Sequence, residues 1–158
     1  MSALTSLTLA IEVAERARDQ ADQAWQQARR GLQFARGQLE QLESYAADTE
    51  ARWGTAAAVT VSAELMRHHQ HFMQRLRHAM GLQTGVVNDL ERQAETARVQ
   101  RVQQEVRLKA LQQLLEKKLA ERARLQARRE QKQMDEMAIL AHARNGAVAG
   151  RRMTGESL

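Results

Sequence analysis

The stretch "WQQARRGLQFARGQLEQLESYAADTEARW", from Trp25 to Trp53, repeats a mostly apolar position at alternating steps of three and four residues. The same steps lead back to Leu7, and twelve of the fourteen positions reached between Leu7 and Trp53 are apolar. An apolar period of 3.5 residues held over this length is typical of a coiled coil and predicts left-handed supercoiling. We therefore predict a first helix over about residues 6–53, packed along another helix.

The apolar pattern stops at "RWGTAAAVTVSAE", residues 52–64. Gly54 fits the position just after a helix end, where a positive φ is favoured. Thr60 and Ser62 are candidate N-caps for a second helix. We predict a turn over residues 54–61, and so short a connection makes the two helices antiparallel neighbours.

A second apolar stripe follows the turn. Its predicted positions are Leu65, His69, Phe72, Leu76, Ala79, Gln83, Val86, Leu90 and Ala97, and then Leu108, Leu111, Leu115 and Leu119. Neither Gly nor Pro occurs between Asn88 and Arg144, so we predict a second helix over about residues 62–142. The fold class is all-α: a long antiparallel two-helix coiled-coil hairpin over residues 1–144, with the second helix longer and overhanging. Residues 145–158 are expected to form a flexible C-terminal tail.

Folding the hairpin about the turn predicts which residues face each other. The expected pairs are Leu42 with Phe72 or Met73, Trp25 with Leu90, and Leu7 with Leu108. The same register places two pairs of glycines opposite each other, Gly31 with Gly85 and Gly37 with Gly81. Either the backbones approach closely there, or glycine is merely tolerated at some cost in helix stability.

The composition excludes several classes of site. The chain has no Cys, so it has no disulfide, no thiolate metal ligand and no Cys nucleophile. The N-terminus has no basic segment typical of a signal peptide. No apolar run approaches the roughly 18 residues that a membrane span needs. We expect a soluble cytoplasmic protein without a cofactor.

The positive charge is concentrated in the second half of the chain. Residues 1–91 hold 9 Arg against 11 acidic residues, whereas residues 92–132 hold 12 Lys and Arg against 5 Glu. The predicted overhang also carries four Leu side chains without a partner in the chain: Leu111, Leu115, Leu119 and Leu125. An apolar stripe edged by charge marks a binding surface. The basic residues of this predicted tip are Arg122, Arg124, Arg128, Arg129 and Lys132.

No group of residues predicts an active site or a metal site. His68 and His71 have a helical ligand spacing, but only Glu64 accompanies them on that face, so solvated histidines are the preferred interpretation. The glycines form no phosphate-binding pattern, and a two-helix rod lacks the concave pocket of an enzyme. We predict neither catalysis nor a small-molecule substrate. Nucleic acid is not an expected partner, because no aromatic side chains interleave with the basic residues.

Three motifs resemble those of a known family. They are "GQLEQLESY" at 37–45, "HQHFMQRLRHA" at 69–79 and "REQKQMDEMA" at 129–138. Together with the hairpin length, they make the chain similar to the flagellar FliJ family over almost its whole length. The resemblance implies a non-enzymatic component of the flagellar type III export apparatus, with a fold similar to the central-stalk coiled coil of rotary ATPases.

The resemblance also implies partners and a location. Members of this family are understood to insert into the ring of the export ATPase FliI and to promote its assembly. They also contact the export-gate protein FlhA and bind flagellar substrate chaperones. By this resemblance the chain would be cytoplasmic and peripherally associated with the export gate in the inner membrane. The basic tip would face acidic loops of the ATPase ring.

The family's gate contact is carried by side chains of both helices. The matching positions in this chain are Gln38, Leu42, Tyr45, Phe72, Leu76 and Ala79. Thr49 and Gln83 depart from the family pattern, which has an aromatic residue and His there. Leu42, Phe72 and Leu76 could instead simply pack the seam between the helices, and both interpretations stay open.

Three alternatives to the flagellar assignment follow from the same features, and the simplest is a plain structural tether. A stalk protein of a virulence-type type III secretion system would share the hairpin, the length and the charge. A nucleic-acid-binding coiled coil would use the basic second half to neutralise phosphates.

Overall fold

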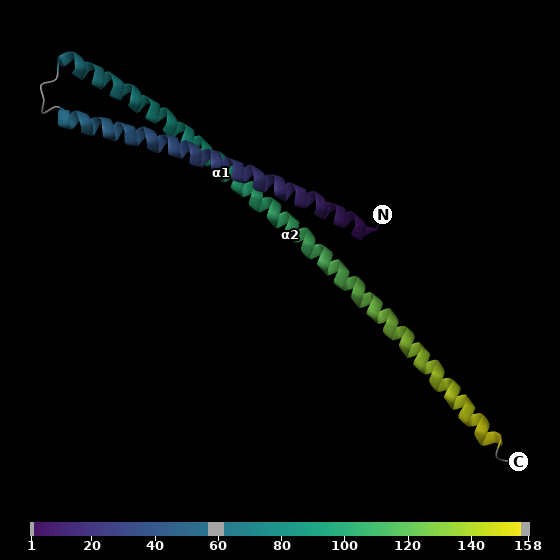
Figure 1. Ribbon diagram of the computed structural model, residues 1–158. Coiled ribbons are helices and arrows are strands. Elements are labelled where there is room, and N and C mark those ends of the chain that lie inside the picture. The colour runs from purple at the N-terminus through teal and green to yellow at the C-terminus, as the bar shows by residue number, and fades with distance from the viewer. Residues whose placement is uncertain (1, 57–61, 156–158) are drawn as a thin grey trace. The chain divides into compact units, whose positions relative to one another are not determined.

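The computed structural model describes residues 2–56 and 62–155, and nearly all of them are helical. Helix α1 spans Ala3–Ala56 and helix α2 spans Ala63–Gly155, and no strand occurs in the described part of the chain (Figure 1). The two helices make an all-α hairpin, as the sequence predicts. The chain divides into two units, the paired helices of Ile11–Lys109 and a second unit made of Met1–Ala10 with Ala110–Leu158.

Each helix begins at a serine that caps it. The backbone N–H of Thr5 donates a hydrogen bond to Ser2 Oγ at 3.2 Å, and that of Leu65 donates to Ser62 Oγ, also at 3.2 Å. These bonds satisfy backbone donors that have no acceptor within the first turn of a helix. The prediction of Ser62 as an N-cap is therefore confirmed, whereas Thr60 lies outside the described residues.

The helix ends differ from the sequence prediction. Helix α1 continues through Gly54 to Ala56, and no described glycine has a positive φ, so the role predicted for Gly54 as a helix terminator is wrong. Helix α2 continues past residue 142 to Gly155, with Gly146 and Gly150 inside it. A single Gly costs a helix only about 1 kcal/mol, and the neighbouring Ala and Arg residues are good helix formers. The stretch expected to be a flexible tail is helical as far as Gly155.

The stripe predicted for the first helix is confirmed by burial. All fourteen positions from Leu7 to Trp53 are buried or half-buried, including the polar members Arg18 and Thr49. The most enclosed are Ala14 and Ala35, each 3% exposed. Small side chains at these steps let the neighbouring helix approach closely, which is why the seam is rich in Ala.

The seam of α2 uses partly different residues from those predicted. Met73 is 3% exposed and Val87 6%, whereas the predicted Val86 is 46% exposed and Leu65 54%. Apolar residues come in adjacent pairs here, so the sequence allows either neighbour to face α1. The structure uses Met73 and Val87, which keep unbroken steps of three and four through Leu76 and on to Leu108.

The register of the hairpin differs from the prediction by one heptad. The guanidinium of Arg101, rather than Leu90, lies over the ring of Trp25, 4.5 Å from its centroid. Leu90 packs against the core cluster that contains Leu32, seven residues after Trp25. At the other end of the hairpin, Trp53 stacks on His69 with ring centroids 4.2 Å apart. The apolar pattern could not distinguish these registers, because a heptad seam shifted by seven residues again pairs seam with seam.

The structure also shows whether the backbones approach closely at the four glycines. A Cβ added at Gly31, Gly37, Gly81 or Gly85 would meet no atom within 4 Å. There is thus no close backbone approach at these positions, and glycine is only tolerated there.

We expect the seam, rather than the exposed surface, to carry the stability of the hairpin. Leu32 is 8% exposed within its core cluster, so Leu32→Ala should lower the free energy of unfolding by about 2–4 kcal/mol. Leu125→Ala is the matched control, because Leu125 is 54% exposed and its loss should change stability by less than about 0.5 kcal/mol. Urea unfolding followed by circular dichroism measures both. Equal losses in the two variants would contradict the seam assignment.

Candidate partner-binding surfaces

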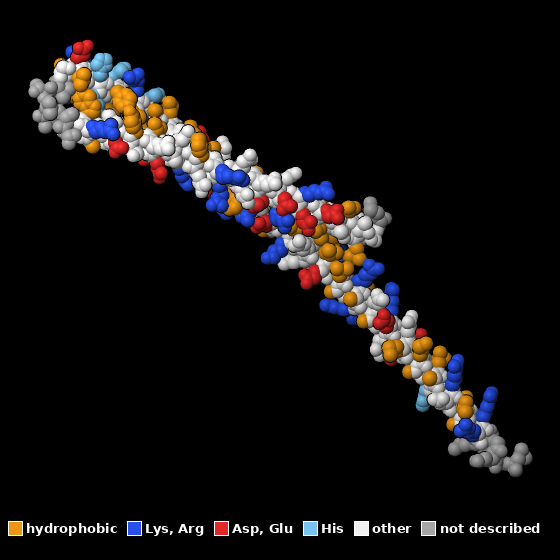
Figure 2. Space-filling model, viewed as in Figure 1, with side chains coloured by type: hydrophobic (Ala, Val, Ile, Leu, Met, Phe, Trp, Pro, Cys, Tyr) orange, Lys and Arg blue, Asp and Glu red, His pale blue; other side chains and the backbone are white. Residues whose placement is uncertain are grey.

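The last part of α2 is exposed on all sides. Every residue from Glu116 to Arg152 is exposed, including all five residues predicted for the basic tip. We call Arg122–Lys132 the basic segment. In Figure 2 Lys and Arg side chains stand out along this helix, with apolar side chains between them. No other part of the described chain covers the basic segment.

The Leu stripe beside the basic segment is only partly free. Leu119 and Leu125 are 48% and 54% exposed, as predicted. Leu111 and Leu115 are half-buried, in the unit that also contains the first ten residues of the chain. The prediction that all four Leu side chains lack a partner is therefore wrong for Leu111 and Leu115.

The charges of the basic segment are available to a partner. Within the described residues, none of its Arg and Lys side chains comes within ion-pair distance of a carboxylate. Arg122 and Arg129 lie two helical turns apart and border a shallow groove that also contains Leu125. Arg124, Arg128 and Lys132 follow each other at steps of four and so share one face of the helix. Cations arranged in this way can meet a partner's carboxylates without first breaking internal ion pairs.

A second shallow groove lies on the paired helices. It is lined by Gln38, Gln41, Leu42, Tyr45 and Gln83. The ring of Tyr45 meets that of Phe72 edge-on, with centroids 6.0 Å apart. Gln83 Nε2 donates one hydrogen bond to the carbonyl of Ala35 at 2.9 Å and another to Gln38 Oε1 at 3.2 Å. Gln83, a residue of the α2 seam, thus lines the surface groove and is hydrogen-bonded to α1.

The six residues predicted as the gate patch divide between surface and core. Gln38 and Tyr45 are exposed, and Leu42, Phe72 and Ala79 are half-buried. Leu76 is 8% exposed and belongs to a core cluster with Ala46 and Met73, so it packs the seam. The structure brings Leu42 and Tyr45 together with Gln83 around one groove. Gln41 was missed because it lies off the stripe, whereas Gln83 carried a signal as a polar residue in an apolar stripe.

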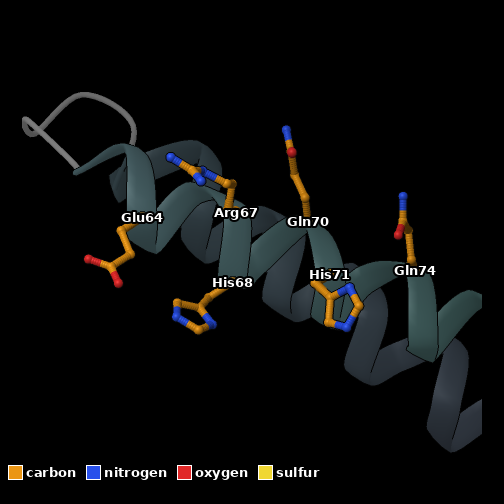
Figure 3. A pocket seen from close by; sticks show the side chains of 6 residues that line it. All are labelled: Glu64, Arg67, His68, Gln70, His71 and Gln74. Carbon is orange, nitrogen blue, oxygen red and sulfur yellow. The ribbon is translucent and has the colours of Figure 1, made fainter.

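The histidine-rich start of α2 forms no enclosed site. Figure 3 shows Glu64, His68 and His71 on α2 with side chains that project outward and do not converge on one point. Among the described residues, no group of three or more His, Cys, Asp or Glu could hold a metal ion. The arrangement therefore offers an open, polar helix face.

On the surface of α2, Glu95 and Arg98 shift each other's pKa values. The hydrogen bond from Arg98, together with its charge, lowers the pKa of Glu95, while partial desolvation opposes the effect. A lowered pKa stabilises the fold above the ordinary pKa of the carboxyl group, and this stabilisation is lost as the pH falls through the lowered value. Because both side chains are exposed to solvent, the pair supports the local helix and marks no chemical site.

Comparisons with known proteins agree with the motifs. The family model described as "Flagellar FliJ protein" matches residues 3–147. No curated protein and no solved structure matches the chain significantly. In the described part of the chain, neither helix has a stretch apolar enough to cross a membrane.

Proposed function

Because this chain belongs to the FliJ family, a non-enzymatic component of the flagellar export apparatus, we propose that it is the stalk of that apparatus. In this role it inserts into the ring of the export ATPase FliI and promotes ring assembly and activity. It also links the ring to the export gate FlhA and to flagellar substrate chaperones. It works in the cytoplasm, peripherally associated with the gate in the inner membrane.

The observation that carries this proposal is the exposed, cationic end of α2. A segment inserted into a ring must be slender and must leave its side chains free for the ring on every side. The basic segment meets both conditions, since it is helical, exposed throughout and without internal ion pairs among the described residues. Acidic loops inside the ring would complement it.

Charge complementarity sets the expected strength of this contact. Exposed ion pairs contribute little affinity individually, but they orient the partners and raise the rate of encounter. The contact should therefore be sensitive to salt, because exposed charges are screened over about 10 Å at 0.1 M ionic strength.

We expect the double reversal Arg128→Glu/Arg129→Glu to weaken stimulation of the cognate export ATPase. The concentration of protein that gives half-maximal stimulation should rise about tenfold at low salt, since two attractions become repulsions. Added salt should reduce the difference between the variant and the natural protein.

The matched control is Arg67→Glu/Arg75→Glu, which makes the same charge change on exposed residues near the start of α2. The ATPase should respond to this control as it does to the natural protein. Undiminished stimulation by the Arg128/Arg129 variant, or an equal loss in the control, would contradict insertion through the basic segment.

We place the gate contact at the groove around Tyr45. Its exposed ring, the neighbouring Leu42 and the bonded pair Gln38–Gln83 combine an apolar anchor with polar edge groups. Aromatic anchors with a polar rim are typical of the energetically dominant parts of protein interfaces. Leu76 supports this surface from the seam and would not touch the gate.

We expect Tyr45→Ala to weaken binding to the cytoplasmic domain of the gate protein about tenfold, the loss typical of a moderate interface anchor. Phe34→Ala is the matched control, because Phe34 is an aromatic residue of α1 that is 69% exposed and lies outside the groove. Isothermal titration calorimetry of both variants with the gate domain measures the two affinities. Loss of binding in Phe34→Ala, or none in Tyr45→Ala, would place the gate contact elsewhere.

A further inference from the structure

The hairpin unit Ile11–Lys109 combines a repeating seam with repeating charges. Three ion pairs connect its helices: Arg36 with Glu91 at 2.8 Å, Glu50 with Arg77 at 2.8 Å, and Asp22 with Arg101 at 3.0 Å. Seven residues before each of these α1 partners the sequence has a residue of the same charge, namely Arg29, Glu43 and Glu15. If α1 slides by one heptad, every pair therefore finds a replacement.

The apolar contacts repeat in the same way. A slide of seven residues brings Leu42 to Met73 and Trp25 to Leu90, so the seam of each helix still meets the seam of the other. Neither the apolar pattern nor the interhelical ion pairs select one register over the other.

The layer around Trp25 breaks this equivalence. Two guanidinium groups lie over its ring, that of Arg101 at 4.5 Å from the centroid and that of Arg29 at 4.6 Å. Arg101 Nε also lies 3.0 Å from Asp22 Oδ1, close enough for an ion pair although the angle does not make a hydrogen bond. Cations are attracted to the face of an indole ring, more so when partly withdrawn from water.

The residue that would replace Trp25 opposes the slide. Seven residues before Trp25 the seam has Arg18, so in the shifted register Arg101 would meet a like charge in place of an indole face. The stack of Trp53 on His69 would also be lost, because Ala46 would come to face His69.

We propose that the hairpin has a second register, one heptad away from the present one, and that the Trp25–Arg101 layer sets the balance between them. A change of register moves one helix along the other by roughly 10 Å, seven residues at 1.5 Å each. A partner that binds one register better than the other would shift this balance. The inference concerns the rod itself and goes beyond the proposed export role.

The absence of cysteine from the sequence makes the test direct. The pair Ala35→Cys/Val87→Cys joins two residues of one core cluster and reports the present register. The pair Ala28→Cys/Val87→Cys keeps the same α2 position, moves the α1 position by one heptad and reports the shifted register. A disulfide needs Cβ atoms within about 4.5 Å, so a slide of roughly 10 Å separates the two pairs.

A third pair, Ala21→Cys/Val87→Cys, controls for unfolding. It would require a slide of two heptads, which brings Asp22 to Glu91 and Arg36 to Arg77. Both contacts join like charges. Disulfide formation in this pair therefore measures random encounters of an opened chain.

Under mild oxidation of the whole protein, followed by gel shift and mass spectrometry, the Ala35/Val87 pair should react fastest. The Ala28/Val87 pair should react more slowly, but well above the Ala21/Val87 control. Trp25→Leu removes the indole face, and Arg18→Glu turns the opposing charge into an attractive one. Each should raise the Ala28/Val87 rate relative to the Ala35/Val87 rate about tenfold, which corresponds to 1.4 kcal/mol.

Two results would overturn the proposal. One is an Ala28/Val87 rate no greater than that of the Ala21/Val87 control in the natural background and in both variants. The other is an unchanged ratio of the Ala28/Val87 and Ala35/Val87 rates in Trp25→Leu and Arg18→Glu. Because Arg18→Glu leaves the Trp25 ring in place, the two variants test the layer independently.

Discussion

The structure depends on one thin apolar seam between two helices. Neither helix could bury its apolar stripe alone. Aromatic residues make up only 3% of the chain, too few to fill a wider core. Small side chains such as Ala14, Ala35 and Ala46 allow close approach along the seam. Larger ones, such as Leu32 and Met73, fill the remaining space in separate clusters. The interhelical ion pairs and the groove around Tyr45 lie along this line of contact.

The helices and the α1 stripe could be predicted from the sequence, because burial follows directly from a period of 3.5 residues. The choice between Val86 and Val87 could not, since two adjacent apolar residues satisfy the period almost equally. The apolar pattern could not predict the register of the hairpin either, because a heptad repeat looks the same after a slide of seven residues. Only specific contacts, such as Arg101 on Trp25 and Trp53 on His69, distinguish the alternatives. Gly54 predicts the end of the first helix, but α1 continues to Ala56 because a single Gly only weakens a helix.

The candidate surfaces were predictable to different degrees. The basic segment follows from charge counting, and its exposure follows from the greater length of α2. The groove at Tyr45 follows in part from family motifs, but only the structure shows which of the predicted residues line it. Leu76 belongs to the core and Gln83 to the groove, although both occupy the same stripe. A stripe position therefore predicts that a residue lies near the partner helix, but not which of its atoms remain accessible.

The shallow burial of the seam has a thermodynamic consequence. Even its best covered large side chains keep a few per cent of their surface exposed, and no described large side chain is fully enclosed. Unfolding such a rod exposes little new apolar area for its length, so its heat-capacity change and its denaturant dependence per residue are small. A partner that binds only the folded rod adds to this stability by mass action.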